Sequence, residues 1–317
     1  MILVTGATGF IGSHLVEALA AGGYACRSLV RRAGCHLPGE VVFGDLAGGG
    51  SLDQALRGIE LVIHLAGVTK ALSPAGYYAG NTRATEVLAS AIAGRGIRLV
   101  YVSSLAAVGP SLDGTPLTED AEPHPLTDYG KSKLAAERSV RALLSDAVIV
   151  RPPVVYGPRD TGVFEFLKLL SKGLAPEIRG GERWFSAIYV TDLVEGILAA
   201  AFAGCAAGRT YFLAPAQPVC WSELAATAAR IMGRRAHTIR IPRAAALAIG
   251  YGAELWSRAT GKPGVLNRDK IREAQCLCWT CDPQRAAAEL GFHARTALAD
   301  GLAQTLAWYK GAGWLHY

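Results

Sequence analysis

The sequence has little charge for its length. Of its 317 residues, 18% are Asp, Glu, Lys or Arg, whereas 51% are hydrophobic and 37 are glycine. This composition excludes a disordered chain, and the length allows one large α/β unit, or a core domain with a smaller second one. No Pro/Ser-rich linker separates two halves, so we expect no tethered domain.

The chain also lacks a nucleic-acid-binding module and any continuous basic stripe. Its formal net charge of +6 comes from scattered Lys and Arg residues, with short clusters at 31–32 and 234–235. We therefore expect a solvated basic surface rather than a nucleic-acid interface, and an anionic ligand remains possible.

The start of the sequence carries no secretory signal. Met1 leads directly into an apolar strand and a glycine loop, so we expect a cytoplasmic location.

The chain has seven cysteines, an odd number, which fits reduced intracellular thiols better than a disulfide framework. The cluster "CLCWTC" offers Cys276, Cys278 and Cys281 as potential zinc ligands, but their spacing is uneven and no second pair matches them. We expect partly buried thiols and no metal.

No apolar run is long enough to span a membrane. The late stretch "IPRAAALAIGYGAELWSR", residues 241–258, is interrupted by Arg243, Gly250, Gly252 and Glu254. It predicts an amphipathic helix that covers a substrate pocket, with contact to a membrane surface as the second interpretation.

Short apolar runs separated by helical segments fill the first half of the chain. They include "MILVTG", "ACRSLV", "EVVFGDL", "LVIHLAG", "RLVYVSS" and "AVIVRPPVVYGP". This pattern predicts an α/β fold with a doubly wound parallel sheet of the Rossmann type. We expect a dinucleotide-binding domain over residues 1–161. Residues 162–317 should form mainly a smaller substrate-binding lobe, with elements that return to the core sheet.

A glycine loop joins the first strand to the first helix. Gly6, Gly9 and Gly12 lie between an apolar strand and an amphipathic helix. Such glycines allow a tight turn, close approach of the backbone to a pyrophosphate and close helix–strand packing, while the helix N-terminus favours the phosphate charge. The context therefore predicts a dinucleotide site.

The stretch "YGKSK" places Tyr129 and Lys133 four residues apart, on one face of a predicted helix. It could be ordinary helix surface or an acid/base pair. A free phenol has a pKa of about 10, and a nearby ammonium lowers it toward a useful value. "YVSSLAAVGP" supplies serines at the end of a predicted strand that could hold a substrate oxygen, which favours catalysis.

"TGATGFIG" and "YGKSK" together resemble the extended short-chain dehydrogenase/reductase family, also described as the NAD-dependent epimerase/dehydratase family. The resemblance covers nearly the whole chain in order, through "GDL" at 44–46, "HLAG" at 64–67, Asn81, "VSSLAAVG" at 102–109, "RPPVVYGP" at 151–158 and "YVTDLVEGI" at 189–197. It implies that Tyr129 exchanges a proton with the substrate oxygen, that Lys133 also binds the nicotinamide ribose and that Ser104 is the catalytic serine.

The resemblance also implies a set of cofactor-binding residues. These are Gly6, Thr8, Gly9, Phe10, Ile11, Gly12, Arg31, Arg32, Asp45, Leu46, Leu65, Ala66, Gly67, Asn81, Val102, Tyr129, Lys133, Pro152 and Val154. An acid at the end of the second strand selects NAD, whereas a cation suits the 2′-phosphate of NADP. Arg31 and Arg32 stand there, so we favour NADP(H), and NAD(H) stays open.

Two departures from the family's patterns restrict the reaction. Leu105 and Ala106 follow Ser104 where dehydratases carry an Asp-Glu pair, and Val154 stands where nucleotide-sugar epimerases carry an anion-binding asparagine. The sequence is closest in pattern to dihydroflavonol reductases and 3β-hydroxysteroid dehydrogenases. We expect an oxidoreductase that interconverts a secondary alcohol and a ketone on a small, substantially apolar substrate. The expected substrate contacts are Thr69, Lys70, Ser104, His124 and Arg183.

Two alternatives stay open. Arg183 could pair with a phosphate, as in a nucleotide-sugar epimerase with tightly bound NAD. The chain could also be a non-catalytic dinucleotide-binding subunit of an assembly, although it keeps the tyrosine and lysine that such proteins tend to lose. By resemblance we expect a homodimer, with the helix at Tyr129 to Leu144 as a candidate interface.

Overall fold

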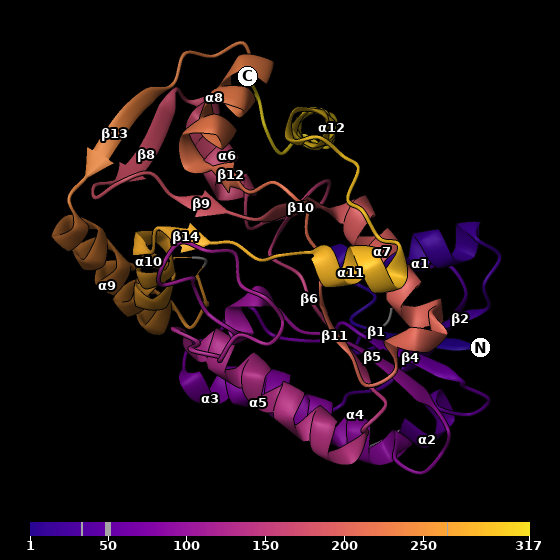
Figure 1. Cartoon of the computed structure of the whole chain (residues 1–317). Helices are drawn as coiled ribbons and strands as arrows, with labels where there is room; N and C mark the ends of the chain where they lie inside the picture. The colour runs from indigo at the N-terminus through magenta and orange to yellow at the C-terminus, as the bar shows by residue number, and fades with distance from the viewer. Residues whose placement is uncertain (33, 48–51, 265) are drawn as a thin grey trace.

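The computed structural model describes residues 1–32, 34–47, 52–264 and 266–317. Its centre is a seven-stranded parallel sheet with the strand order β11-β6-β5-β4-β1-β2-β3 (Figure 1). The strands are β1 (Ile2–Thr5), β2 (Cys26–Val30), β3 (Glu40–Phe43), β4 (Leu61–His64), β5 (Arg98–Val102), β6 (Val148–Arg151) and β11 (Thr210–Phe212). The order 3-2-1-4-5-6 is that of dinucleotide-binding sheets, which confirms the predicted fold class.

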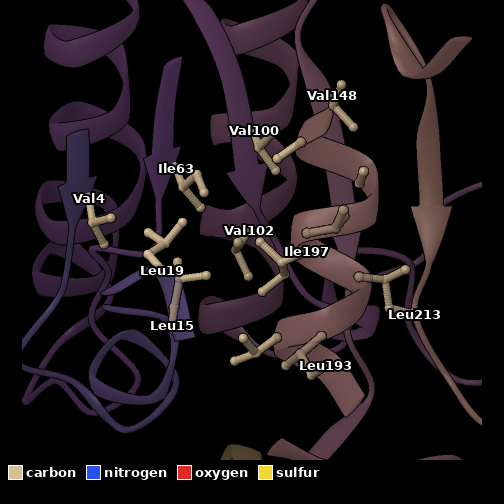
Figure 2. Close-up of a cluster of buried hydrophobic side chains, with 14 of the residues drawn as sticks. Val4, Leu15, Leu19, Ile63, Val100, Val102, Val148, Leu193, Ile197 and Leu213 are labelled. Carbon is tan, nitrogen blue, oxygen red and sulfur yellow. The ribbon is translucent and has the colours of Figure 1, made fainter. Parts of the chain in front are cut away.

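Helices cover both faces of this sheet. One face packs against α1 (Phe10–Ala21) and α7 (Val190–Phe202). Figure 2 shows the apolar layer between the sheet and these helices, to which Leu15 of α1 and Ile197 of α7 contribute. The other face packs against α4 (Ala84–Ile92) and α5 (Asp128–Leu143). In β4, Ile63 packs in the layer under α1 and α7, whereas Val62 packs in the layer under α4 and α5. Strands buried on both faces have no polar alternation, which is why they appear as continuous apolar runs.

Short helices connect these layers. They are α2 (Leu52–Ala55), α3 (Pro74–Tyr77) and α11 (Gln284–Leu290). The helix before β5 begins as a π-helical turn, Tyr78–Arg83, and continues as α4.

The second half builds a separate apolar core beyond the sheet, which includes Leu167, Leu224 and Tyr309. Its helices are α6 (Phe164–Ser171), α8 (Trp221–Ile231), α9 (Arg243–Thr260), α10 (Arg268–Gln275) and α12 (Leu298–Gly311). Its strands are β7 (Val154–Tyr156), β8 (Leu174–Ile178), β9 (Trp184–Phe185), β10 (Ala187–Tyr189), β12 (Val219–Cys220), β13 (His237–Ile241) and β14 (Cys278–Trp279). The domain division at residue 161 stays a prediction, since α7 and β11 follow it and pack in the Rossmann core.

The apolar stretch "WFSAIYV" is two strands and not one. Trp184–Phe185 pairs with β12 and β14, whereas Ala187–Tyr189 pairs with β7. Ser186 separates them, and its hydroxyl accepts a hydrogen bond from the Cys281 amide at 3.2 Å. The segment thus links two small sheets of the lobe.

The late cysteines are thiols with separate surroundings. Cys276 donates to the Arg272 carbonyl, Cys278 lies 3.1 Å from the Thr280 hydroxyl, and burial raises the pKa of Cys281 to about 12. Within the described ranges, no group of three or more His, Cys, Asp or Glu side chains is arranged to hold a metal. Those ranges also contain no helix that is long and apolar enough to cross a bilayer.

A buried ion pair connects the last strand before the lobe to α5. Arg151 in β6 donates two hydrogen bonds to the Glu137 carboxylate, at 3.0 and 2.6 Å, and the two side chains are only 8% and 5% exposed. Two parallel bonds of this kind fix both position and orientation. The pair therefore sets where α5 lies on the sheet.

We expect Glu137→Ala to lower the free energy of unfolding by about 3–5 kcal/mol, because it leaves the Arg151 guanidinium buried without a counter-charge. Urea unfolding measures this loss, and the double variant Glu137→Leu/Arg151→Met should recover most of it. The matched control is Asp53→Ala, which breaks the exposed Arg95–Asp53 pair and should cost less than about 1 kcal/mol. An equal loss in both single variants would contradict the structural role of the pair.

Candidate active site

The predicted site residues gather at the carboxyl edge of the sheet. Each of six strands ends at a group of them: Gly6 to Gly12 after β1, Arg31 and Arg32 after β2, Asp45 and Leu46 after β3, Leu65 to Lys70 after β4, Val102 to Ser104 at the end of β5, and Pro152 and Val154 after β6. Open α/β sheets bind ligands at this edge. The edge thus brings together segments that lie up to 150 residues apart.

The glycine loop can only form with glycine at two positions. Gly6 has a φ of +76°, and a Cβ there would lie 2.6 Å from the Ala66 nitrogen at the end of β4. A Cβ on Gly12 would lie 2.1 Å from the Gly6 carbonyl oxygen. Both contacts are too close for any other residue, so the loop needs glycine to lie against the sheet.

Helix α1 starts without a side-chain cap. Gly9 is its N-cap residue, no side chain bonds the first-turn amides, and no acidic residue lies in that turn. The first amides of a helix have no partner within the helix and attract anions. The residues present therefore fit a dinucleotide, with the amides at Phe10, Ile11 and Gly12 as the group that would hold its pyrophosphate.

Lys133 is buried where α5 crosses the end of β5. Its ammonium donates to the Val102 carbonyl at 2.8 Å and lies 4.3 Å from the centre of the Tyr101 ring. Burial lowers its pKa to about 7, while the Glu137 carboxylate acts in the opposite direction. The ammonium also lies near Gly67 and Asn81, and its contact with a nicotinamide ribose stays a prediction.

Tyr129 lies one helical turn before Lys133. Burial raises the pKa of Tyr129 to about 12, a hydrogen bond with Ser104 lowers it, and the Glu273 carboxylate raises it. The Tyr77 ring lies 6.2 Å away in an edge-on arrangement. At neutral pH the phenol therefore keeps its proton, which is the form that donates to an oxygen gaining negative charge.

Ser104 is the serine that faces Tyr129. Its hydroxyl accepts from the Ala106 amide at 3.1 Å and so begins the short turn Leu105–Ala107. The neighbouring Ser103 is buried, and its hydroxyl has no hydrogen-bond partner in the described part of the chain. The structure thus separates the two serines and places Ser104 beside the tyrosine, while its catalytic role stays a prediction.

Sequence reasoning found Asn81 but missed the network that holds it. The Asn81 amide accepts from the Val68 nitrogen at 2.6 Å and donates to the Val68 carbonyl and to the Ser132 hydroxyl. It thereby fixes the loop after β4 against α5. Ser132 belongs to the motif "YGKSK", but its partner lies 51 residues away, so the sequence alone gave no sign of this contact.

A second series of hydrogen bonds, through His64 and Thr85, reaches the backbone of Asn81. The ring of His64 contacts the Thr5 and Thr85 hydroxyls at 2.6 and 2.9 Å, and Thr85 donates to the Asn81 carbonyl. Burial and the nearby Lys133 charge lower the pKa of His64 to about 3, so the ring is neutral. A neutral imidazole can satisfy one donor and one acceptor here.

The lobe contributes two acids to the start of α5. The Asp269 carboxylate in α10 accepts from the Asp128 amide at 2.9 Å, and the Thr127 hydroxyl donates to Glu273 at 3.4 Å. Thr127 also caps α5 by accepting from the Gly130 amide. Sequence reasoning missed both acids because they lie more than 140 residues from their partners.

Of the four residues after β2 and β3 that were expected to bind the cofactor, three lie at the surface. Arg31 and Arg32 are exposed directly after β2, and in the described ranges neither side chain forms an ion pair or hydrogen bond. Asp45 is exposed and accepts from the Ala47 amide, whereas Leu46 is buried. Their contacts with a cofactor stay a prediction.

Thr69 and Lys70 lie on the loop after β4. Thr69 is exposed, and the charge of Lys70 lowers the pKa of the buried Asp160, although burial is the larger effect and raises it. Lys70 therefore approaches the point where the chain enters the lobe. Contact of either residue with substrate stays a prediction.

The expectation for His124 is corrected. His124 is exposed and lines a surface hollow with Lys131, Leu134 and Arg138 of α5. With about 3.6 residues per turn, that side of α5 is roughly opposite to Tyr129. His124 is therefore not placed to touch a substrate held by Tyr129.

Arg183, another expected substrate contact, is engaged by the lobe itself. It is 9% exposed, and its guanidinium donates to the carbonyls of Ala274, Gly181 and Arg179 at 2.6, 2.9 and 3.4 Å. These bonds tie β9 to the end of α10. The side chain is thus engaged in the lobe's own backbone, which removes the main sequence argument for a phosphate contact.

The family model "NAD dependent epimerase/dehydratase family" matches residues 2–213. The chain belongs to this family. It is 35% identical to a ceramide reductase of Caulobacter vibrioides over 99% of this chain and 96% of the relative. It is 30% identical to a farnesyl-dihydroquinoline-oxide ketoreductase of Stigmatella aurantiaca, over 94% and 93% of the two chains. Reductases are thus among its relatives, and the chain is an NAD(P)-dependent enzyme.

Epimerases of the family are similar as well. An undecaprenol-diphosphate-linked N-acetylglucosamine 4-epimerase of Escherichia coli O157:H7 is 27% identical over 96% of this chain and 94% of the relative. The solved structure of MoeE5 in complex with UDP-glucose and NAD superposes with a TM-score of 0.79, at 27% identity over 98% of this chain and 99% of that one.

We expect Lys133→Met to raise stability at pH 6 relative to the wild type, because folding buries a charged ammonium there at a cost. The folded-state pKa is about 7, and that of an unfolded lysine is about 10.4, so the penalty is full below pH 7 and disappears as the pH rises through 10. The difference in free energy of unfolding between variant and wild type should therefore decrease from pH 6 to pH 10. The control Lys131→Met removes an exposed ammonium and should show no such trend. A constant difference in the Lys133 variant would contradict the buried ammonium.

Proposed function

We propose that this protein is an NADP(H)-dependent reductase that converts a ketone to a secondary alcohol on a substantially apolar, lipid-like substrate. The observation that carries this proposal is the buried Tyr129, which keeps its proton at neutral pH and is hydrogen-bonded to Ser104. A protonated phenol at this position can donate a proton to the oxygen of a ketone as the ketone is reduced. The similarity to a ceramide reductase and a farnesyl-bearing ketoreductase supports a substrate with a long apolar part.

In this mechanism the nicotinamide supplies the hydride. The Ser104 hydroxyl donates to the ketone oxygen and orients the carbonyl. Tyr129 donates its phenolic proton to the same oxygen as negative charge develops there. The Lys133 ammonium stabilises the phenolate that remains and holds the ribose, while the Val102 carbonyl keeps the lysine in place.

A second candidate is an epimerase with tightly bound NAD, favoured by the similarity to MoeE5 and to the lipid-linked sugar epimerase. In this chain Val154 occupies the asparagine position and Arg183 is bonded to backbone carbonyls. Both features weaken diphosphate binding. An NAD that copurifies and shows no net oxidation would favour the epimerase.

Tyr129→Phe should lower kcat for ketone reduction by about 10²–10⁴-fold, because the general acid is lost. NADPH affinity should change little, since the ring remains. Stopped-flow and steady-state absorbance of NADPH measure both quantities. The control Tyr78→Phe changes an exposed tyrosine nearby and should keep full activity. Undiminished turnover in Tyr129→Phe would contradict the mechanism and revive a non-catalytic role in an assembly.

The double variant Arg31→Ala/Arg32→Ala should weaken NADPH binding by about tenfold or more and leave NADH binding nearly unchanged, because charged hydrogen bonds to the 2′-phosphate contribute about 1.5–3 kcal/mol each. Calorimetric titration of cofactor-free protein at fixed salt gives both affinities. Arg57→Ala/Arg83→Ala, two exposed arginines of the same domain, controls for net charge. A wild-type preference for NADH would replace NADP(H) by NAD(H) in this proposal.

A further inference from the structure

Helix α9 turns an apolar face to solvent. Ile249, Tyr251, Leu255 and Trp256 are 48%, 51%, 64% and 72% exposed, and four alanines and Gly252 complete the exposed side. We call this surface the α9 apolar face. At about 100° per residue these positions share one side of the helix. Scattered exposed apolar residues are normal, but a contiguous set of large ones marks an interaction surface.

The helix is fixed so that this face cannot turn inward. On its other side Gly250 packs against Ile271 of α10, where a Cβ would lie 2.9 Å from the isoleucine. Glu254 accepts from Arg268 of α10 at 2.5 and 2.8 Å and from Arg258 at 2.6 Å. Figure 1 shows α9 and α10 together at one end of the molecule. The amphipathic helix predicted at 241–258 is therefore present, with its apolar side outward.

The chain around α9 carries the protein's excess positive charge. Residues 230–262 contain seven Lys and Arg residues and one Glu, a net charge of +6, which equals that of the whole chain. Arg234, Arg235 and Lys262 are exposed, and within the described ranges they have no ion-pair partner. In sequence, Arg234 and Arg235 precede β13 and Lys262 follows α9, so basic residues come before and after the apolar face. An apolar helix face in a positively charged segment is complementary to an anionic bilayer, in which acyl chains lie beneath acidic headgroups.

The inner side of α9 leads toward the catalytic tyrosine. Glu254, Ser257 and Arg258 line a cavity of about 130 Å³ together with Tyr77 and Asp128. The Tyr77 ring is the one that lies 6.2 Å from the Tyr129 ring. One helix thus carries the outward apolar face and also borders a cavity beside the site.

We infer that the α9 apolar face and its basic flanks dock this protein on the surface of an anionic lipid bilayer. The helix lies in the interface with Leu255 and Trp256 among the acyl chains, and Arg234, Arg235 and Lys262 contact acidic headgroups. The role of this docking rests on the proposed function. A lipid ketone in the membrane would then reach Tyr129 along the inner side of α9.

Co-sedimentation of the full chain with phosphatidylcholine vesicles, with and without phosphatidylglycerol, tests the docking. Binding should require phosphatidylglycerol and weaken with salt. Leu255→Glu/Trp256→Glu should lower the partition coefficient by about tenfold or more, because two apolar side chains no longer leave water. Arg234→Glu/Arg235→Glu should lower it by at least about fivefold per residue.

Two matched variants control for general effects. Leu112→Glu changes an 84% exposed leucine on a loop of the other domain, and Arg57→Glu/Arg295→Glu reverses two exposed charges outside residues 230–262. Both should bind vesicles like the wild type. Equal loss in controls and test variants, or no loss in Leu255→Glu/Trp256→Glu, would overturn the inference.

Two further readouts separate the remaining outcomes. If Leu255→Glu/Trp256→Glu converts a dimer to a monomer in sedimentation velocity, a second copy covers the face and the docking inference fails. Turnover of NADPH with a short, water-soluble ketone reports on the proposed function alone. Normal turnover without vesicle binding overturns docking and keeps the function, whereas vesicle binding without turnover of any ketone overturns the function and keeps docking.

Discussion

The buried contact between Lys133 and the Val102 carbonyl is the constraint on which the site depends. It holds α5 over the end of β5, and because Tyr129 lies one turn before the lysine and Ser104 two residues after the valine, it brings phenol and hydroxyl together. An ammonium away from water is costly unless bonded. The Arg151–Glu137 pair and the Asn81 network pack around the same helix and keep the lysine in this position.

Much of the fold and the centre of the site followed from the sequence, because their signals are local. The apolar runs of a sheet buried on both faces are each a few residues long, and Gly6, Gly9 and Gly12 lie within one loop. Tyr129 and Lys133 share a helix face by their spacing alone. For these residues neighbours in sequence are also neighbours in space, so pattern and geometry coincide.

The errors and omissions share the opposite cause. Asp269 and Glu273 reach α5 only because the lobe folds back across the site, and nothing near either residue in sequence indicates it. Arg183 was expected to contact substrate, yet its partners are backbone carbonyls, which carry no sequence signature. His124 was expected to contact the substrate, but it lies beside Lys131, Leu134 and Arg138, on the side of α5 that faces away from Tyr129.

The two acids of α10 hold the start of α5, so this helix is positioned by residues from both halves of the molecule. The amide of Asp128 begins α5, yet its acceptor belongs to the lobe. Any rotation that parts the lobe from the sheet must expose this amide to water and remove the Glu273 charge that opposes ionisation of Tyr129. Parting of the two halves would therefore change the water exposure of this amide and the charge around Tyr129 together.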